Sequence, residues 1–291
     1  YMEKNMANII NAIINLVREP QFRLREYATG RNRANNMGES LEEYIKDLFA
    51  DTVNENNEQI RTEKISSTFS YLGNQNNPPD MILKQGDAIE VKKIELPNSS
   101  LALNSSYPKA KLFSSNPMLK KACRECDGGN WIEKDMIYSV GVVDNDKLTA
   151  LCFVYGDDYC ATQDVYEQIK MYIKKGITQI EDVEFSETKE LGRVNKVDPL
   201  GITYLRIRGM WGIENPFTVF NYIYTRNPNC SFNFMAIIND EKFNSLENKS
   251  DLFSSAEKNN SLVINDIKIK DPNNPAKLKN AKLITFLYSE E

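Results

Sequence analysis

The sequence predicts a mixed α/β (α+β) fold in which a central mixed β-sheet is flanked by helices. The chain has 291 residues and 41% of them are hydrophobic, which is enough for a sizeable core. Some segments repeat apolar residues at helical spacing, whereas others alternate them as strands do. Because no internal repeat and no clear linker divides the chain, we expect one domain over residues 1–291, with residues 240–291 as a less certain C-terminal extension.

Two helices are predicted in the first fifty residues. Residues 7–18 carry isoleucines at helical spacing and predict a helix that faces the core. Residues 38–49 predict a second helix, whose apolar stripe is formed by Leu41, Tyr44, Ile45 and Leu48. The connection between them, residues 21–37, has arginines that could touch a DNA backbone or simply solvate a loop, namely Arg23, Arg25, Arg31 and Arg33.

The segment Pro78–Lys93, PPDMILKQGDAIEVKK, predicts a β-hairpin. Residues 81–83 are apolar, as in a buried strand, and Gly86 gives the following turn a residue that can adopt positive φ. The next strand alternates apolar and charged residues, which places Glu90 and Lys92 on one face.

Asp80 precedes the first strand of this hairpin, and pairing of the two strands would bring it towards Glu90 and Lys92. Two carboxylates at one point can share Mg²⁺, a hard cation that prefers oxygen ligands, and the lysine can stabilise developing negative charge or position a water. A solvated hairpin face is the alternative, since Glu-x-Lys is common on alternating strands. The chain has no histidine, which excludes the nucleases and the serine or cysteine hydrolases that depend on one.

The net charge is −5, yet positive charge gathers in two segments. Residues 92–121 hold six lysines against one glutamate, and residues 189–211 hold five basic residues against two acidic ones. Residues 133–187, by contrast, hold twelve acidic residues against five lysines. Local charge governs contact with phosphates, so the two positive segments favour nucleic acid as a partner, although such clusters also arise by chance.

Candidate DNA-contacting residues lie in these positive segments. Residues 94–117 have little periodicity, and their Lys109 and Lys111 could contact phosphates or bases; an ordinary long loop is the alternative. Residues 191–217 include a predicted strand at 204–207. The candidates there for reading bases or holding phosphates are Arg193, Lys196, Arg206 and Arg208, of which the last two would share a strand face. Pairing with local carboxylates is the alternative for each.

The other predicted elements are strands of the sheet and a helix that flanks it. Two core strands flank an Asp-Asn-Asp turn, at 135–143 and 147–155. An amphipathic helix at 164–175 has Asp164 as its N-cap and is followed by Gly176. Residues 219–224 and 232–238 are apolar and are expected in the core, residues 241–275 turn polar, and residues 281–288 predict a last strand.

The chain carries no mark of a membrane or secreted protein. No apolar run approaches the roughly 20 residues that span a bilayer, and the first residues do not resemble a signal peptide, so a cytoplasmic location is expected. The odd number of cysteines, five, does not suggest a disulfide framework. Cys123 and Cys126 form a C-x-x-C, but zinc would need two more ligands at suitable spacing, so free thiols are favoured.

The hairpin resembles that of the PD-(D/E)XK nuclease superfamily in its Pro-Asp before an apolar strand and in its Glu-Val-Lys triplet. Longer stretches resemble the NgoPII-like type II restriction endonucleases: NNPPDMILKQGDAIEVKKIE, LALNSSYPKAKL, LGRVNKVDPLGIT and LRIRGMWGIENP. This likeness runs from the first predicted helix to about residue 225. The expected fold is therefore restriction-endonuclease-like.

The resemblance implies a Mg²⁺-dependent enzyme that cuts both strands of duplex DNA at a short palindrome and is paired with a cognate DNA methyltransferase. GGCC is suggested as the site by this resemblance alone. A palindrome calls for two-fold symmetry, so a homodimer is expected. On the matching motifs, Asp80, Glu90 and Lys92 carry over as the catalytic set, in which the two acids and the Val91 carbonyl hold Mg²⁺ and the lysine orients the attacking water.

Glu42 is a further candidate catalytic acid. It lies at the edge of the buried face of its predicted helix, where a carboxylate is either a surface residue or a site residue. Many PD-(D/E)XK enzymes take one more acid from a helix ahead of the hairpin, and that resemblance assigns Glu42 to the site, with Glu39 as the second choice.

Two other functions remain open from the residues. One is a repair or structure-specific nuclease of the same fold. The other is a DNA-binding module whose hairpin is catalytically inactive, and the intact Asp80, Glu90 and Lys92 argue against it.

Overall fold

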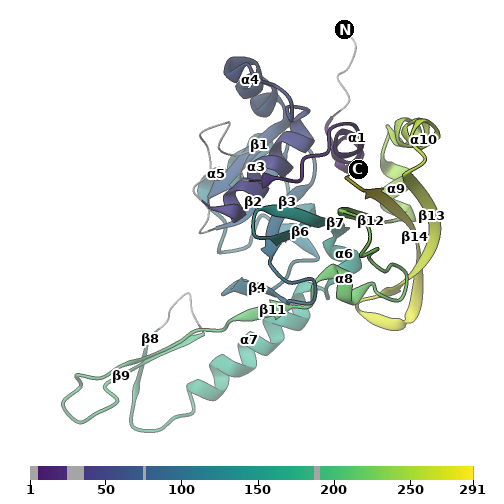
Figure 1. Cartoon of the computed structure of the whole chain (residues 1–291). Coiled ribbons are helices and arrows are strands. Elements are labelled where there is room, and N and C mark those ends of the chain that lie inside the picture. Colours follow the sequence, from purple (N-terminus) through teal and green to yellow (C-terminus); the bar gives the residue numbers. More distant parts are fainter. Residues whose placement is uncertain (1–5, 25–35, 75–76, 187–190, 291) are drawn as a thin grey trace.

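A central mixed β-sheet forms the body of the protein (Figure 1). The computed structural model describes residues 6–24, 36–74, 77–186 and 191–290. The strands of the sheet are β1 (Phe69–Asn74), β2 (Asn77–Leu83), β3 (Ala88–Ile94), β5 (Lys111–Phe113), β6 (Glu133–Asp144), β7 (Lys147–Tyr155), β12 (Phe232–Asn239), β13 (Leu262–Asp271) and β14 (Asn274–Tyr288). Their order is β1-β2-β3-β6-β7-β12-β14-β13, with β5 paired to β6. Strand β3 runs parallel to β6 and β7 parallel to β12, while the other neighbours are antiparallel, so the predicted mixed sheet is confirmed.

Helices and two small sheets surround this body. The helical elements are α1 (Ile9–Arg18), α3 (Met37–Ala50), α4 (Glu58–Thr68), α5 (Lys121–Glu125), the 3₁₀ turn η1 (Cys126–Gly129), α6 (Gly156–Tyr159), α7 (Gln163–Ile177), α8 (Pro216–Val219), α9 (Asp240–Ser245) and α10 (Lys249–Lys258). The small sheets pair β4 (Leu101–Asn104) with β11 (Trp211–Ile213), and β9 (Gly192–Asn195) with both β8 (Glu184–Ser186) and β10 (Leu205–Ile207). None of the described helices is long and apolar enough to cross a membrane.

The sheet has an apolar core on each face. Along β6, Ile137 and Val143 join the core that α1, α3 and α10 cover, whereas Tyr138 and Val140 join the core under β4 and α8. We call these two sides the helical face and the β4 face. Since side chains alternate along a strand, each face takes every second residue, and this alternation decides where the charged residues of β3 point.

The predicted helices at 7–18 and 38–49 are confirmed as α1 and α3. Asn8 caps α1 by accepting from the Ile10 N–H at 2.9 Å, and Ile9, Ile10 and Ile13 are buried on the helical face. The stripe of α3 is buried as predicted. The connection predicted between them lies outside the described residues from 25 to 35.

Helix α7 and the small sheet β8–β9–β10 form an arm that projects from the body (Figure 1). The helix predicted at 164–175 exists, but none of its described residues is buried and its N-cap is Thr162 rather than Asp164. Gly176 does not end it, because the helix continues to Ile177. The side chain of Ile177, the last residue of the helix, packs at Gly192 of β9.

Other differences from the sequence prediction arise from distant pairing. The expected loop at 94–117 contains β4 and β5, whose partners β11 and β6 are remote in sequence and leave no local pattern. The polar segment 241–275 contains α9, α10 and the edge strand β13, which tolerates polar residues because one of its sides is unpaired. Strand β12 confirms the core predicted at 232–238, whereas in 219–224 Phe220 is buried but Tyr222 is exposed.

Candidate active site

The hairpin β2–β3 forms as predicted and sets the site. Met81 pairs with Ile89 and Ile82 with Ala88, in an antiparallel register. Its turn differs in one detail: Gln85, and not Gly86, takes the left-handed conformation, with φ 53°. The Gln85 N–H donates to the Asp127 carboxylate at 2.9 Å, which holds this turn in place.

The register of β3 directs its two charged side chains to the β4 face. Ile89 and Val91 pack on the helical face, while Ala88 and Ile94 join the core of the β4 face. Glu90 and Lys92 alternate with the first pair and therefore share the β4 face. Glu90 pairs in register with Tyr138 of the central strand β6, so the site lies over the middle of the sheet.

The structure brings Asp80, Glu90 and Lys92 together. Asp80 Oδ2 accepts a hydrogen bond from the Val91 N–H at 2.6 Å, and Lys92 Nζ donates to Glu90 Oε1 at 2.5 Å. These two contacts join the start of β2 to the middle of β3. The juxtaposition predicted from the spacing of the hairpin is present.

Burial and like charge shape the electrostatics of the site. Burial, together with the Glu90 carboxylate, raises the pKa of Asp80 well above its usual value, against the opposing effect of Lys92 and the Val91 N–H. Burial lowers the pKa of Lys92, but Glu90 and Asp80 outweigh it and the net pKa is raised. Lys92 is therefore a cation at neutral pH, held beside two acids whose mutual repulsion it only partly offsets.

The donor set of the site fits a hard cation. Glu90 Oε2 is buried and has no hydrogen-bond partner within the described residues, an arrangement that costs free energy unless something positive contacts this oxygen. No group of three or more acidic or cysteine side chains in the described ranges could hold a metal ion. A cation here would therefore rely on Asp80, Glu90 and the Val91 carbonyl.

Glu42 lies close enough to the hairpin to interact electrostatically with Glu90. Burial raises the pKa of Glu42 and Lys46 lowers it, while the carboxylates of Glu43 and Glu90 raise it further. Glu39, in the first turn of α3, donates its backbone N–H to the Asn36 side chain at 3.0 Å. Glu42 thus contributes negative charge near the site from the helical side of the hairpin.

Lys109 lies inside the protein rather than on its surface, with 6% of the residue exposed. Its backbone N–H donates to the Tyr138 hydroxyl at 2.7 Å, and its ammonium donates to Ser106 and to the Tyr107 carbonyl. Burial lowers the pKa of Lys109, with Glu90 raising it and Lys92 lowering it. The structure therefore places Lys109 beside the acidic hairpin.

Lys111 occupies a different environment, since its ammonium contacts Glu133 at 2.7 Å and Asp135 at 3.4 Å. The hydrogen bond to Glu133 and the charges of Asp135 and Asp157 raise its pKa, against the effect of burial. The side chain is one-third exposed, so it is paired locally at the surface of the body.

The four basic candidates of the later segment lie on the arm or next to it. Arg193 Nε donates to Asn195 at 2.9 Å, and its guanidinium lies 4.3 Å from the centre of the Tyr204 ring. Lys196 forms an ion pair with Glu184. Arg206 lies in β10 and pairs in register with Arg193. Arg208 lies beyond the end of β10, so the two arginines do not share a strand face as predicted.

The sequence reasoning missed Gly73 as a positioning residue. A Cβ on Gly73 would lie 2.3 Å from the Pro79 carbonyl oxygen and 3.1 Å from that of Asp80, so only glycine lets β1 pass this close to Asp80. A glycine inside a strand pattern, as in FSYLGN, is the signal that could have indicated it.

The cysteines of the C-x-x-C lie in the core of the β4 face. Cys123 and Cys126 are buried free thiols, and burial raises the pKa of Cys123 to about 12. Such a thiol stays protonated at neutral pH.

A mixed sheet flanked by helices, with two acids and a lysine on one hairpin, is typical of restriction-endonuclease-like nucleases. The family model described as NgoPII restriction endonuclease matches residues 7–270. The chain is 58% identical over 280 residues to the type II restriction enzyme NgoPII of Neisseria gonorrhoeae. The aligned region covers 96% of this chain and 99% of that protein. The chain belongs to the NgoPII restriction endonuclease family, as its motifs predicted. No solved structure matches it.

Proposed function

We propose that the protein is a Mg²⁺-dependent type II enzyme that hydrolyses one phosphodiester bond in each strand of duplex DNA at a short palindrome. The observation that supports this most is the contact of Asp80 with Val91 and of Lys92 with Glu90 on one hairpin. GGCC as the site rests on the family resemblance alone. The cognate DNA methyltransferase and a cytoplasmic location, where such an enzyme would meet incoming DNA, belong to the same proposal.

In this proposal the metal is held by Asp80, Glu90 and the Val91 carbonyl. When bound, Mg²⁺ supplies Lewis-acid polarisation of the scissile phosphate and lowers the pKa of a water. The unpartnered Glu90 Oε2 supports the assignment, because a cation would contact this buried oxygen. Burial and the Glu90 carboxylate raise the pKa of Asp80, and a bound cation would favour its ionised form.

The chain's own residues have distinct tasks. The Val91 N–H fixes one Asp80 oxygen and so orients the other towards the site. Lys92 stays protonated, orients the attacking water and offsets the negative charge that develops on the phosphate. Its contact with Glu90 holds the ammonium in place before the substrate arrives, which lowers the cost of reorganisation.

Cleavage of both strands favours a homodimer, since the described residues contain one such hairpin per chain. The arm supplies an apolar surface for a second copy. Of the 22 large apolar side chains that are exposed in the described part of the chain, 12 lie in residues 165–210. Apolar surface of this extent is typical of protein interfaces.

Replacing Lys92 by Ala tests the catalytic assignment. We expect cleavage of duplex DNA in Mg²⁺ to be lost while binding in Ca²⁺ persists, because the amine acts mainly on the transition state. The matched control is Lys93→Ala, since Lys93 is next on the same strand but pairs with Glu95 at 2.9 Å. Normal cleavage by the Lys92 variant would reject the assignment.

Digestion of a mixed-sequence plasmid separates this function from its rivals. Discrete bands whose sequenced ends share one motif are expected from a site-specific enzyme. A smear or structure-dependent nicking would instead favour a repair nuclease, and binding without any metal-dependent cleavage would favour an inactive module.

A further inference from the structure

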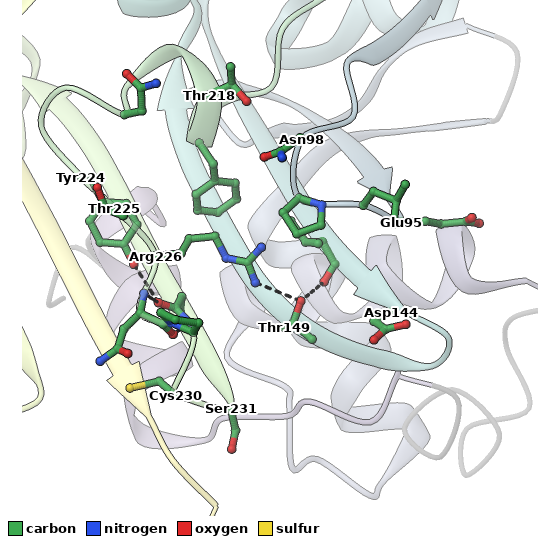
Figure 2. A pocket seen from close by; sticks show the side chains of 18 residues that line it. Glu95, Asn98, Asp144, Thr149, Thr218, Tyr224, Thr225, Arg226, Cys230 and Ser231 are labelled. Atoms are coloured by element: carbon green, nitrogen blue, oxygen red, sulfur yellow. Dashed lines mark hydrogen bonds between the residues drawn. The ribbon is translucent and has the colours of Figure 1, made fainter.

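A cavity of about 780 Å³ opens on the β4 face at the edge of the sheet where β3 and β6 end (Figure 2). Its walls come from the segment that follows β3, from the end of β6 and the start of β7, from α8, and from the turn that carries Arg226. None of these residues is needed for the catalytic contacts described above. The contacts of Asp80, Glu90 and Lys92 therefore do not account for this cavity.

The guanidinium of Arg226 reaches into this cavity and, among the described residues, is held by a single hydrogen bond. Its Nη2 donates to Thr149 Oγ1 at 3.3 Å, and the Thr149 hydroxyl in turn donates to the Val142 carbonyl at 3.2 Å (Figure 2). The threonine can therefore only accept from the arginine. The Nε of Arg226 is buried and has no partner within the described residues.

No carboxylate among the described residues forms an ion pair with Arg226. Burial lowers its pKa, and the only group that acts in the opposite direction is Tyr224. Glu95 and Asp144 gather at one side of the cavity, where Glu95 pairs with Lys93 and Asp144 accepts from the Asn145 amide.

In the described part of the chain neither carboxylate forms an ion pair with Arg226. The ring of Phe217, 5.6 Å from its Cζ, supports the guanidinium without balancing its charge. Burying a cation without an anionic partner costs free energy, and an anionic ligand in the cavity would balance the charge of Arg226.

The cavity lies next to the catalytic hairpin on the same face of the sheet. In the parallel register, Lys92 pairs with Val140 and Ile94 with Val142, and Val142 lines the cavity. Two residues along a strand span about 7 Å. Because each DNA strand carries a phosphate about every 3.4 Å of helix axis, a strand cut at Lys92 would present its neighbouring phosphates near the cavity.

We infer that this cavity is a phosphate site in which Arg226 is the cationic ligand, and that it takes a backbone phosphate next to the scissile one. The planar guanidinium suits two parallel hydrogen bonds to phosphate oxygens, and its Nε is left available for one of them. The DNA source of the phosphate rests on the proposed function, whereas the phosphate chemistry does not.

The salt dependence of duplex binding tests this site. For Arg226→Gln, measured by fluorescence anisotropy in Ca²⁺, we expect affinity to fall about tenfold at low salt. We also expect the slope of log K against log salt to decrease by about 0.9, the mark of one lost phosphate contact. Thr149→Val keeps the charge but removes the acceptor that orients it, so it should lower affinity and leave the slope unchanged.

Arg18→Gln is the matched control, since Arg18 lies in α1 on the other face and pairs with Asp51. It removes the same charge and should leave the slope as in the wild type. Unfolding of each variant in urea checks that the fold is kept. An unchanged slope for Arg226→Gln would overturn the DNA assignment.

Calorimetric titration with inorganic phosphate separates the two possible sources. If Arg226→Gln loses phosphate binding but keeps the wild-type slope for DNA, the cavity takes a free phosphate instead of the backbone. If it changes neither, the whole inference is wrong. A wild-type protein that binds no duplex would contradict the proposed function, and the phosphate titration would then decide on the cavity alone.

Discussion

Gly73 determines how closely β1 approaches Asp80, the proposed catalytic acid. A methyl group there would overlap the Pro79 carbonyl oxygen at 2.3 Å, so Gly73→Ala must displace the backbone that carries Asp80. We expect a fall in kcat of about 100-fold, because small displacements of catalytic groups are costly, and a loss of about 2 kcal/mol in the free energy of unfolding. Plasmid cleavage at saturating DNA and urea unfolding measure the two effects.

Gly176→Ala is the control for this substitution. An added Cβ at Gly176 meets nothing within 4 Å, and the residue lies inside α7, so alanine there should keep activity and favour the helix. Wild-type kcat in the Gly73 variant would show that the hairpin does not depend on this close approach.

Glu42 is expected to act through its charge. Its carboxylate interacts electrostatically with Glu90 and raises the pKa of Asp80, so it adds to the negative potential of the site. Glu42→Gln should raise the Mg²⁺ concentration for half-maximal cleavage about tenfold, as loss of an outer carboxylate does at other metal sites, with little change in stability. Titration of cleavage with Mg²⁺ measures this.

Glu63→Gln is the control because Glu63 is exposed on α4 and accepts a hydrogen bond from Gln59 of the same helix. An unaltered Mg²⁺ requirement in the Glu42 variant would assign that residue to the structure of α3 and not to the site.

At the scale of elements, one lysine of α9 connects the β2–β3 hairpin to β6. Lys242 of α9 donates to Asp87, in the turn between β2 and β3, at 2.7 Å and to Asp135 of β6 at 2.6 Å. The Tyr155 hydroxyl also donates to Asp87, at 2.8 Å. Lys242→Met would leave two partly buried acids without their cation, and we expect a loss of about 3 kcal/mol in the free energy of unfolding at neutral pH.

The same network predicts how stability depends on pH. Burial raises the pKa of Asp135, but the hydrogen bond from Lys242 outweighs it and the net pKa is lowered, so this contribution is present above the ordinary carboxyl pKa. It is lost as pH falls below about 4. Burial lowers the pKa of Lys242, but Asp87 and Asp135 outweigh burial, and the net pKa is raised. The contribution of Lys242 to stability is therefore lost as pH rises above about 10.

Urea midpoints measured from pH 3 to pH 11 test this account. The Lys242 variant should show a flatter profile than the wild type at the alkaline end, where the contribution of Lys242 is lost. Equal midpoints for the two proteins at pH 7 would show that the bridge does not stabilise the fold.

At the scale of the whole molecule, the arm is the expected contact with a second copy. Ile169 and Ile173 are 45% and 40% exposed and stand one turn apart on α7. Replacing both by Glu should convert a dimer to a monomer, because charge on both sides of a two-fold contact repels and the apolar burial is lost. Sedimentation velocity measures the oligomeric state, and accumulation of nicked plasmid is expected in the monomeric variant.

Phe253→Glu is the control for the arm, since Phe253 is equally exposed on α10 but lies on the opposite side of the body. A wild-type protein that sediments as a monomer, or a double variant that still dimerises, would contradict the role of the arm.

We also propose that residues 240–290 belong to the same domain as the rest of the chain. Strand β14 pairs with β12 from Asn239 to Phe232, and the Asn8 side chain donates to Asn248 at 2.7 Å. The single domain stays a prediction, and limited proteolysis that released this segment intact would count against it.

How much the sequence predicted depends on the range of the interactions involved. The hairpin, the stripes of α1 and α3, and the pair of strands around residue 145 follow from local periodicity, so they were predictable without the fold. Strands β4, β5 and β13 were not, because their partners stand far away in sequence and their own residues are polar or few.

By itself, the sequence determined which side chains meet at the candidate site. Residues two apart on a strand, such as Glu90 and Lys92, point to the same face, and the short turn of the hairpin brings Asp80 to that face. Only the tertiary structure decided the surroundings: that Lys109 is buried beside the acids, that Gly73 must be small, and that Arg226 meets Thr149 across the end of the sheet. The physical reason is that burial and charge compensation depend on segments that come together only when the whole sheet has formed.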